Sequence, residues 1–387
     1  MIYLDNAATS FPKPRRVWEE QERCMRTYCG NPGRGSHALA MRAAEKIYDC
    51  RAMAAEFFDV PAPERVIFTL NTTSALNMAI KGLLRTGDHV LLSDMEHNAV
   101  FRPVYKLARE GKITYDIFRT PLSVKGLTKE AFCAGIEERI RPDTRMLVCA
   151  HASNLCGVSL PLGAIGAVCK KHGIFFVVDA AQSAGILPIR MQKDGIDALC
   201  VPGHKGLWGP QGCGMLMLGE TVSADTLIEG GSGYQSLDGN MPADPPERYE
   251  AGTLPTPAIA GLLEGIRAVR EIGTEQIFAH EAGLCRELRD ALSEMPGVRI
   301  YVPEAVGSAL LFSLEGVPSD VVGSELDRLG FCVRAGYHCA ALAHASLKTP
   351  AGGAVRVSPG WRATEREMRS FRDAVAKLCR ELQPENP

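Results

Sequence analysis

The sequence lacks the patterns that would place this protein in a membrane, on nucleic acid or outside the cell. No apolar run approaches the roughly 20 residues needed to cross a bilayer. The first residues, MIYLDNAATSF, contain no basic stretch followed by an apolar one, so they predict no signal peptide. The net charge is only −2, with both signs interspersed, which gives no electrostatic reason to expect nucleic acid or an anionic membrane as a partner. We therefore expect a cytoplasmic protein.

Paired cysteines are also absent, although cysteine itself is plentiful. The 13 cysteines have irregular spacings and form no Cys-x-x-Cys pair, which argues against a zinc ribbon and against a disulfide framework. Many lie in apolar runs, where a buried free thiol is the ordinary interpretation. Cys339, in RAGYHCAALAHAS, differs because His338 precedes it directly and His344 follows it five residues later. Since no second cysteine pair or carboxylate cluster accompanies them, we predict no metal site there.

Short apolar runs alternate with helical patterns along roughly the first 255 residues. Uninterrupted apolar strands separated by helices are typical of a mostly parallel sheet that helices cover on both faces. After this region the pattern changes to long helices, short strands and a final helix, with FCVRA (331–335) predicted as one strand. We predict an α/β domain followed by a smaller α+β domain. The strands predicted in the first part are RVIFT (65–69), HVLLS (89–93), RMLVCA (145–150), IFFVVD (174–179), DALCV (197–201) and CGMLML (213–218).

Two charged residues at predicted strand ends suggest a cofactor site. Asp179 ends the strand in VVDAAQS, and Lys205 follows the strand DALCV in the Gly-rich segment PGHKGLWGPQGCG. Taken singly, Asp179 is most simply a helix N-cap and Lys205 a solvated loop lysine. A desolvated lysine, however, is an amine nucleophile that can form a Schiff base. Because parallel strand ends share one crevice, the pair fits pyridoxal phosphate chemistry, in which the carboxylate faces the pyridinium nitrogen.

Two further strand ends carry polar residues whose role the residues alone leave open. The segment LNTTSALN places Thr72 and Thr73 at a strand-to-helix junction, which is either an anion site or an ordinary helix cap. His97, in DMEHNAVFRP, is either a surface histidine or one that stacks on an aromatic cofactor and shuttles protons. Together with Asp179 and Lys205, these two features indicate a cofactor site more specifically than any one of the four does alone.

The chain resembles the cysteine desulfurases, fold-type I pyridoxal phosphate enzymes of the class V aminotransferase group. This resemblance implies a seven-stranded sheet in a large cofactor-binding domain (14–262), a small domain (1–13 with 263–387) and pyridoxal 5′-phosphate as cofactor. It also implies conversion of L-cysteine to L-alanine, with the sulfur left as a persulfide on Cys339 and passed to an acceptor protein or a small thiol. The matching segments, in chain order, are YLDNAAT, NPGRGSHALAMRA, TTSALN, EHNA, ASNLCGV, VDAAQS, GHK, RYEAGT, RAGYHCA and VRVSPGWRATEREM.

The resemblance also assigns cofactor-binding roles. Lys205 matches the lysine that carries the cofactor, and Asp179 matches the carboxylate that keeps its ring nitrogen protonated. Gln182 matches the residue that bonds the phenolic oxygen, and His97 the histidine stacked on the ring. The matches to the phosphate site are Thr72, Thr73 and His204. Two neighbouring positions depart from the family pattern, with Pro202 where Ser is frequent and Asn71 where Gly is common.

The resemblance also implies which residues bind the substrate and transfer the sulfur. Asn154 and Arg356 match the pair that holds the substrate α-carboxylate, which the arginine fork grips in bidentate fashion. Thr253 matches a threonine that reaches the phosphate of the neighbouring subunit, so the resemblance implies a homodimer with shared sites. Because the nucleophile is a thiolate, we expect His338 and Arg334 to help lower the pKa of Cys339.

Other functions suit the same residues. A selenocysteine β-lyase acting on L-selenocysteine needs the same site, since selenium leaves more easily than sulfur. An aminotransferase or another lyase of this fold is a second alternative. A scaffold or redox module that uses its thiols is a third, which the Lys205, Asp179, His97 and Arg356 set disfavours. The pathway served, whether iron–sulfur cluster assembly, transfer-RNA thiolation or another, stays open.

Overall fold

The computed structural model describes residues 1–33, 35–122, 128–305 and 307–382. Its largest sheet has seven strands in the order β2-β8-β7-β6-β5-β3-β4. Within this sheet β8 runs antiparallel to both neighbours, and the other adjacent pairs are parallel. The mostly parallel seven-stranded sheet predicted above is therefore confirmed. Its strands are β2 (Val66–Thr69), β3 (His89–Ser93), β4 (Thr114–Phe118), β5 (Thr144–Ala150), β6 (Phe175–Asp179), β7 (Ala198–Pro202) and β8 (Gly214–Leu218).

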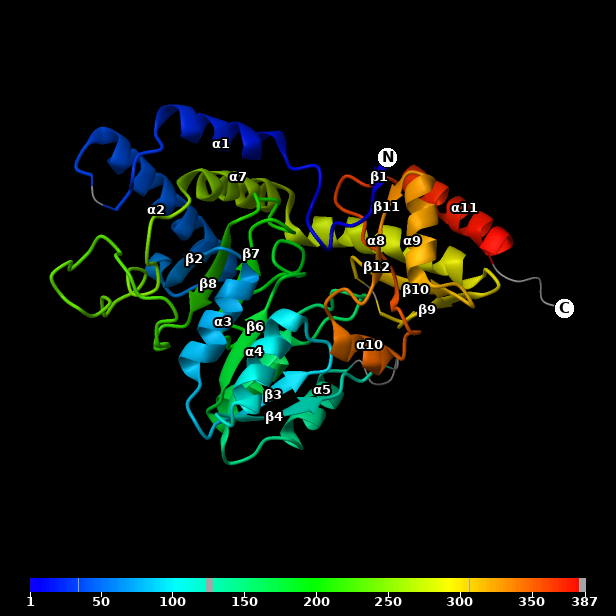
Figure 1. Ribbon diagram of the computed structural model, residues 1–387, viewed down its shortest axis with the longest axis horizontal. Helices are drawn as coiled ribbons and strands as arrows, with labels where there is room; N and C mark the ends of the chain where they lie inside the picture. Colours follow the sequence, from blue (N-terminus) through cyan, green and yellow to red (C-terminus); the bar gives the residue numbers. More distant parts are fainter. Residues whose placement is uncertain (34, 123–127, 306, 383–387) are drawn as a thin grey trace.

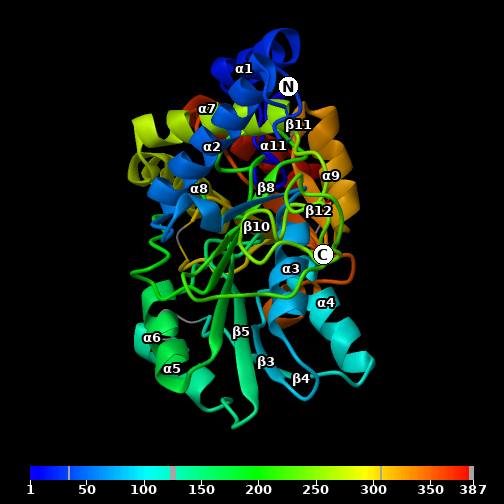
Figure 2. The ribbon, with the colours of Figure 1, turned by 90° about the vertical axis from the view of Figure 1, so that its left-hand side faces the viewer.

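Each strand sends alternate side chains to opposite faces of this sheet, and each face has its own core. Leu91 and Phe176 belong to the core that includes residues of α5 and α6, whereas Val90 and Val177 belong to the core shared with α3 and α4. Figure 2 shows these two helix pairs on opposite sides of the sheet. Burial on both faces explains why the inner strands are continuous apolar runs. The helices are α3 (Thr72–Leu83), α4 (Asn98–Arg109), α5 (Lys129–Glu137) and α6 (Leu162–His172).

Three further helices close the upper end of the large sheet as Figure 1 shows it. Helix α7 (Thr256–Ile272) packs against both α1 (Arg15–Thr27) and α2 (Ala38–Phe58). Residues of α2 and α7 join the same core as α5 and α6. A short 3-10 helix, η1 (Pro63–Arg65), leads from α2 into β2.

The C-terminal part forms a second unit beside the large sheet (Figure 1). Its four-stranded sheet has the order β12-β13-β10-β9, and one core joins it to α8, α9 and α11. The first strand of the chain, β1, pairs in parallel with β11, so both ends of the chain meet in this unit. The bounds are β1 (Ile2–Tyr3), α8 (Thr274–Ser293), β9 (Val298–Ile300), β10 (Leu310–Leu314), α9 (Ser319–Arg328), β11 (Phe331–Cys332), β12 (Arg334–Gly336), α10 (Ala341–Leu347), β13 (Ala354–Val357) and α11 (Glu365–Leu382).

The prediction of a single strand over 331–335 is wrong. Residues Phe331–Cys332 pair with β1, whereas Arg334–Gly336 pair antiparallel with β13, so the chain changes sheets at Val333. The domain boundaries at 13/14 and 262/263 stay predictions. No helix among the described residues has the length and apolar content of a membrane span, and the cytoplasmic location stays a prediction.

Candidate active site

Most of the predicted site residues meet in one pocket at the carboxyl edge of the large sheet. Each lies at the carboxyl end of a strand or in the segment that follows it, which is where ligands bind in sheets of this kind. Arg356, on β13, adjoins the pocket because its Nη1 donates a 2.9 Å hydrogen bond to the carbonyl oxygen of Asn154. The predicted residues that line the pocket are Thr72, Thr73, His97, Asn154, Asp179, Gln182, His204 and Lys205.

Lys205 lies in the loop after β7 and is half-buried. Burial lowers the pKa of its amine to about 8, and the positive charge of Arg356 acts in the same direction, against the carboxylate of Asp179. A lysine with such a pKa is partly unprotonated near neutral pH and is therefore a usable nucleophile.

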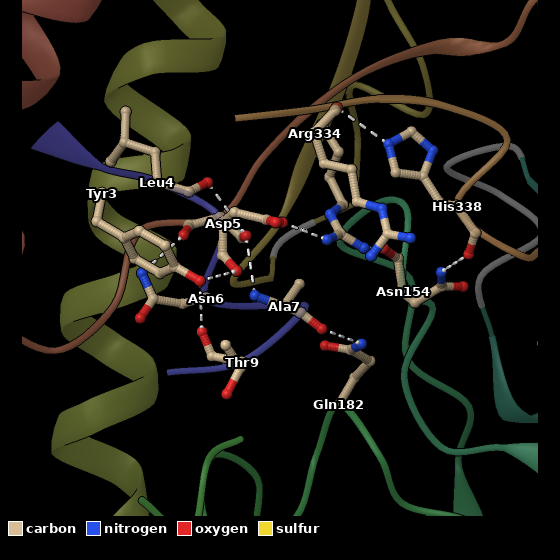
Figure 3. Close-up of polar contacts among 12 residues, drawn as sticks. Tyr3, Leu4, Asp5, Asn6, Ala7, Thr9, Asn154, Gln182, Arg334 and His338 are labelled. Carbon is tan, nitrogen blue, oxygen red and sulfur yellow. Dashed lines mark hydrogen bonds and ion pairs between the residues drawn. The ribbon is translucent and has the colours of Figure 1, made fainter. Parts of the chain in front are cut away.

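Asp179 is the last residue of β6 and is buried. Its Oδ1 accepts a 2.9 Å hydrogen bond from the backbone N–H of Ala181. Burial raises the pKa of Asp179, although that hydrogen bond and the charge of Lys205 oppose the shift. A buried carboxylate of this kind is stabilised by a cation, and a protonated ring nitrogen supplies one. Gln182, nearby, donates 3.0 Å from Nε2 to the carbonyl oxygen of Ala7 and keeps its second N–H for a ligand (Figure 3).

His97 is the N-cap of α4. Its Nδ1 accepts a 3.0 Å hydrogen bond from the backbone N–H of Ala99, so the proton of the neutral ring lies on Nε2. Burial lowers the pKa of His97 to about 4, and the positive charge of Lys205 adds to this. The ring is therefore neutral at physiological pH and presents an N–H within the pocket.

The start of α3 supplies an anion site. Thr72 is buried and its Oγ1 has no hydrogen-bond partner among the described residues, whereas Thr73 is exposed. Asn71, where the family commonly has Gly, is the helix N-cap, and its Oδ1 accepts a 3.0 Å hydrogen bond from Ser74 N–H. The free backbone N–H groups and the unpartnered hydroxyl suit a phosphate. Together with the depressed amine of Lys205 and the buried carboxylate, this chemistry fits pyridoxal phosphate.

An N-terminal segment that was not predicted to belong to the site holds the Lys205 loop in place. The carbonyl oxygen of His204 accepts hydrogen bonds from Thr9 Oγ1 at 3.0 Å, Ser10 N–H at 3.1 Å and Lys13 Nζ at 2.5 Å. Ser10 Oγ also donates to the carbonyl oxygen of Lys205 at 2.9 Å. Burial lowers the pKa of Lys13 to about 8. The N-terminal segment 9–13, called the strap below, therefore fixes the backbone that carries Lys205.

Arg356 is buried and already has an acidic partner. Its Nη2 lies 2.6 Å from Asp5 Oδ1, and its Nε has no partner among the described residues (Figure 3). Burial lowers the pKa of Arg356, and the positive charge of Arg334 acts in the same direction. Within the described part of the chain Arg334 has no ion pair, so the Asp5 carboxylate balances the charge of Arg356 alone. The surplus positive charge suits the carboxylate of an amino acid. Asp5 was not predicted, because its partner lies 351 positions away.

Cys339 is exposed and lies in the turn between β12 and α10. Of the 13 free cysteines only Cys29 and Cys339 are exposed. The expectation that His338 helps to lower the pKa of this thiol as a cation is wrong. The His338 ring is buried and bonds to Arg334 and His344, and burial lowers its pKa to about 3, so it is neutral. The contribution of Arg334 stays a prediction.

Thr253 lies outside the cofactor pocket of its own chain. It lines a second cavity, together with Asn31, Tyr48 and Glu250, where the long segment after β8 meets α2. Thr253 is exposed, as is Thr73 in the cofactor pocket. Thr253 therefore does not line the pocket that contains Thr72 and Thr73.

Comparison with known proteins gives a consistent result. The family model described as aminotransferase class-V matches residues 2–371. A probable cysteine desulfurase of Methanothermobacter thermautotrophicus is 31% identical over 98% of this chain and 94% of the relative, and one of Pyrococcus abyssi is 30% identical over 99% and 95%. The apo structure of the cysteine desulfurase from Thermococcus onnurineus NA1 superposes with a TM-score of 0.87 at 30% identity, covering 98% of this chain and 95% of that one. A cysteine desulfurase structure from Escherichia coli gives 0.85 at 25% identity, covering 98% and 95%. The chain therefore belongs to the class-V aminotransferase family and, within it, to the cysteine desulfurases, which are pyridoxal phosphate enzymes.

Proposed function

We propose that this protein converts L-cysteine to L-alanine and takes the sulfur as a persulfide on Cys339. The observation that supports this most directly is the pairing of an exposed thiol with a pocket built around Lys205 and Asp179. The turn that holds this thiol is bonded to the residue after His97, because Asn98 N–H donates to the Cys339 carbonyl oxygen at 2.7 Å.

Different residues of the chain have different roles in the proposed reaction. Arg356 and Asn154 hold the substrate carboxylate, and Asp179 holds a proton on the ring nitrogen of the cofactor. Bound pyridoxal phosphate supplies an electron sink for the substrate α-carbon. The neutral amine of Lys205 removes the α-proton and returns it later. Thr72, Thr73 and His204 hold the phosphate end.

Sulfur transfer then balances without an outside oxidant. The Cys339 thiolate attacks the substrate sulfur, so an S–S bond forms while the Cβ–S bond breaks. The electron pair of the broken bond stays with Cβ, which takes up a proton and becomes the methyl group of alanine. Cysteine and one enzyme thiol thus give alanine and one enzyme persulfide. The exposure of Cys339 supports onward transfer to an acceptor protein or a small thiol.

We also propose that the protein is a homodimer in which Thr253 completes the partner's phosphate site. Large apolar side chains are exposed on α2, beside Thr72 and in the segment 227–237 that adjoins the Thr253 cavity. Exposed apolar side chains of this size are typical of protein–protein interfaces. The exposed residues are Leu39, Met41, Tyr48, Leu70, Leu227, Ile228, Tyr234 and Leu237.

Mass-spectrometric mapping of persulfide after adding L-cysteine tests the assignment of Cys339. We expect the modification on the peptide with Cys339, and loss of L-cysteine activity by roughly 100-fold or more in Cys339→Ser, since oxygen cannot replace the thiolate. Cys29→Ser removes the other exposed thiol and serves as the matched control. Persulfide on another peptide, or full activity in Cys339→Ser, contradicts the proposal. Retained activity of Cys339→Ala on L-selenocysteine, together with wild-type preference for it, favours the selenocysteine lyase alternative.

A further inference from the structure

We propose that His344 and Thr349 are positioning residues for Cys339, and that with His338 they form a one-way chain of hydrogen bonds that holds the turn presenting the thiol. This inference rests on the proposed role of Cys339 as the sulfur acceptor. We call the three side chains the relay.

The turn needs such support because of its backbone. His338 has φ of +50° and Cys339 has φ of +55°, so two consecutive residues with side chains adopt the left-handed conformation. Residues other than glycine rarely adopt it, because the Cβ atom crowds the backbone, and surrounding contacts must hold it in place.

The direction of each hydrogen bond in the relay can be worked out from the carbonyl oxygen of Arg334, which can only accept a hydrogen bond. His338 Nε2 lies 3.1 Å from the carbonyl oxygen of Arg334, so Nε2 carries the proton. In a neutral ring His338 Nδ1 is then an acceptor, and its neighbour at 3.2 Å, His344 Nε2, must be the donor. By the same reasoning His344 Nδ1 accepts, and it takes the hydroxyl proton of Thr349 at 2.8 Å. The relay runs from Thr349 through both rings to Arg334.

The geometry of the two rings agrees with this assignment. Their planes are 5° apart and their centroids are 5.5 Å apart, whereas the bonded nitrogens are only 3.2 Å apart. The bond therefore runs along the line of the rings rather than between stacked faces. Both rings are buried, and burial lowers the pKa of His338 to about 3 and of His344 to about 4, so both are neutral as the relay requires.

Backbone contacts hold the other side of the same turn. Asn154 Nδ2 donates to the His338 carbonyl oxygen at 2.9 Å (Figure 3), and Asn98 N–H donates to the Cys339 carbonyl oxygen at 2.7 Å. These contacts fix the two carbonyl groups, whereas the relay fixes the His338 side chain. Losing the relay therefore leaves the turn tethered but free to rotate, which moves the thiol without removing any group that binds cofactor or substrate.

The test compares variants that break the relay with variants that keep its donors. His344→Leu and Thr349→Val remove a donor, whereas His344→Gln keeps an N–H near the Nε2 position and Thr349→Ser keeps the hydroxyl. We expect the breaking variants to form persulfide on Cys339 roughly 10- to 100-fold more slowly, with unchanged KM for L-cysteine and unchanged cofactor absorption. The conservative variants retain most of the rate. His280→Leu is the control, because His280 also donates to a carbonyl, that of Ala363 at 2.9 Å, outside this turn.

Hydrogen exchange at the Asn98 amide gives a readout that does not depend on sulfur transfer, because its acceptor is the Cys339 carbonyl oxygen. We expect faster exchange at Asn98 in the breaking variants and wild-type exchange in His280→Leu. If His344→Leu does not fold, Thr349→Val, a smaller change, decides the question. Wild-type persulfide rates and wild-type Asn98 exchange in Thr349→Val overturn the inference. Faster exchange in the variants of a protein that forms no persulfide on Cys339 overturns the proposed function and leaves the relay standing.

Discussion

The backbone N–H of Asn98 donates a 2.7 Å hydrogen bond to the carbonyl oxygen of Cys339. Asn98 is the first residue of α4 and His97 is its N-cap. One helix start therefore holds both the histidine of the cofactor pocket and the turn that carries the exposed thiol. Figure 1 shows that helix α10, which follows this turn, lies beside α4. A backbone hydrogen bond thus joins the turn that carries Cys339 to the pocket that contains His97.

The depressed pKa of Lys205 predicts the pH dependence of cofactor loading. Only the unprotonated amine attacks the cofactor aldehyde, so with a pKa of about 8 the loading rate rises roughly tenfold from pH 7 to 9 and then levels off. Stopped-flow absorption of the apoprotein mixed with pyridoxal phosphate measures this rate. A rate that keeps rising beyond pH 10, as for an ordinary lysine, contradicts the burial argument.

The buried pair of Arg356 and Asp5 predicts a stability effect. Asp5→Asn leaves a buried guanidinium without its counter-charge, so we expect the free energy of unfolding to fall by about 3 kcal/mol. Denaturant titration checks this value. Glu19→Gln breaks the exposed Arg15–Glu19 pair and is the control, with an expected loss below about 1 kcal/mol. Equal effects of the two substitutions contradict the prediction.

The strap predicts an effect on cofactor retention. Lys13→Met removes the cationic donor at the His204 carbonyl oxygen, so the loop that carries Lys205 loosens. We expect the cofactor to be lost roughly tenfold faster on dialysis, the magnitude of one lost charged hydrogen bond. Lys129→Met, at an exposed position that begins α5, is the control. An unchanged rate of cofactor loss in Lys13→Met contradicts the prediction and means that Thr9 and Ser10 alone hold the loop that carries Lys205.

The proposed dimer predicts complementation between two defective variants. In a shared site Lys205 comes from one chain and Thr253 from the other. Lys205→Ala dimers are then inactive and Thr253→Val dimers bind the cofactor weakly. A hybrid of the two has one site with both native residues, so an equal mixture refolded together regains about a quarter of wild-type activity. Activity no higher than the average of the separate variants contradicts a shared site.

An interface variant tests the dimer by another measurement. Leu70→Asp places a charge in the exposed apolar cluster, and sedimentation velocity should show a shift toward monomer with loss of cofactor affinity. Leu329→Asp changes an exposed apolar residue outside that cluster and should leave the sedimentation coefficient unchanged.

Those parts of the molecule that depend on local pattern were predictable, and those that depend on distant contacts were not. The strands from Thr144 to Leu218 were visible because burial on both faces makes them mostly apolar. Strand β4, Thr114–Phe118, was missed because it is an edge strand and mostly half-exposed. The division of 331–335 into two strands depends on partners far away in the sequence, β1 and β13.

The active site, too, was predictable only where the evidence is local in the sequence. Lys205 and Asp179 stand at strand ends, where residue type and position already indicate chemistry. Asp5 and Lys13 gain their roles only from partners that the fold brings to them, and a lone acidic or basic residue near a chain end carries no such signal. The effect of His338 on Cys339 was mispredicted because adjacency to a cysteine says nothing about burial or about which groups bond the ring.

The pair of Asp5 and Arg356 also has a consequence for how the protein is made. The two residues are 351 positions apart, and the strap binds a loop about half the chain away. Contacts of such long sequence separation close late, because a large loop must be ordered before they form. On the ribosome, a chain that has not yet emerged as far as β13 cannot complete the proposed substrate-carboxylate site, although the large sheet is already synthesised. The pair of Asp5 and Arg356 therefore forms only after β13 has been synthesised.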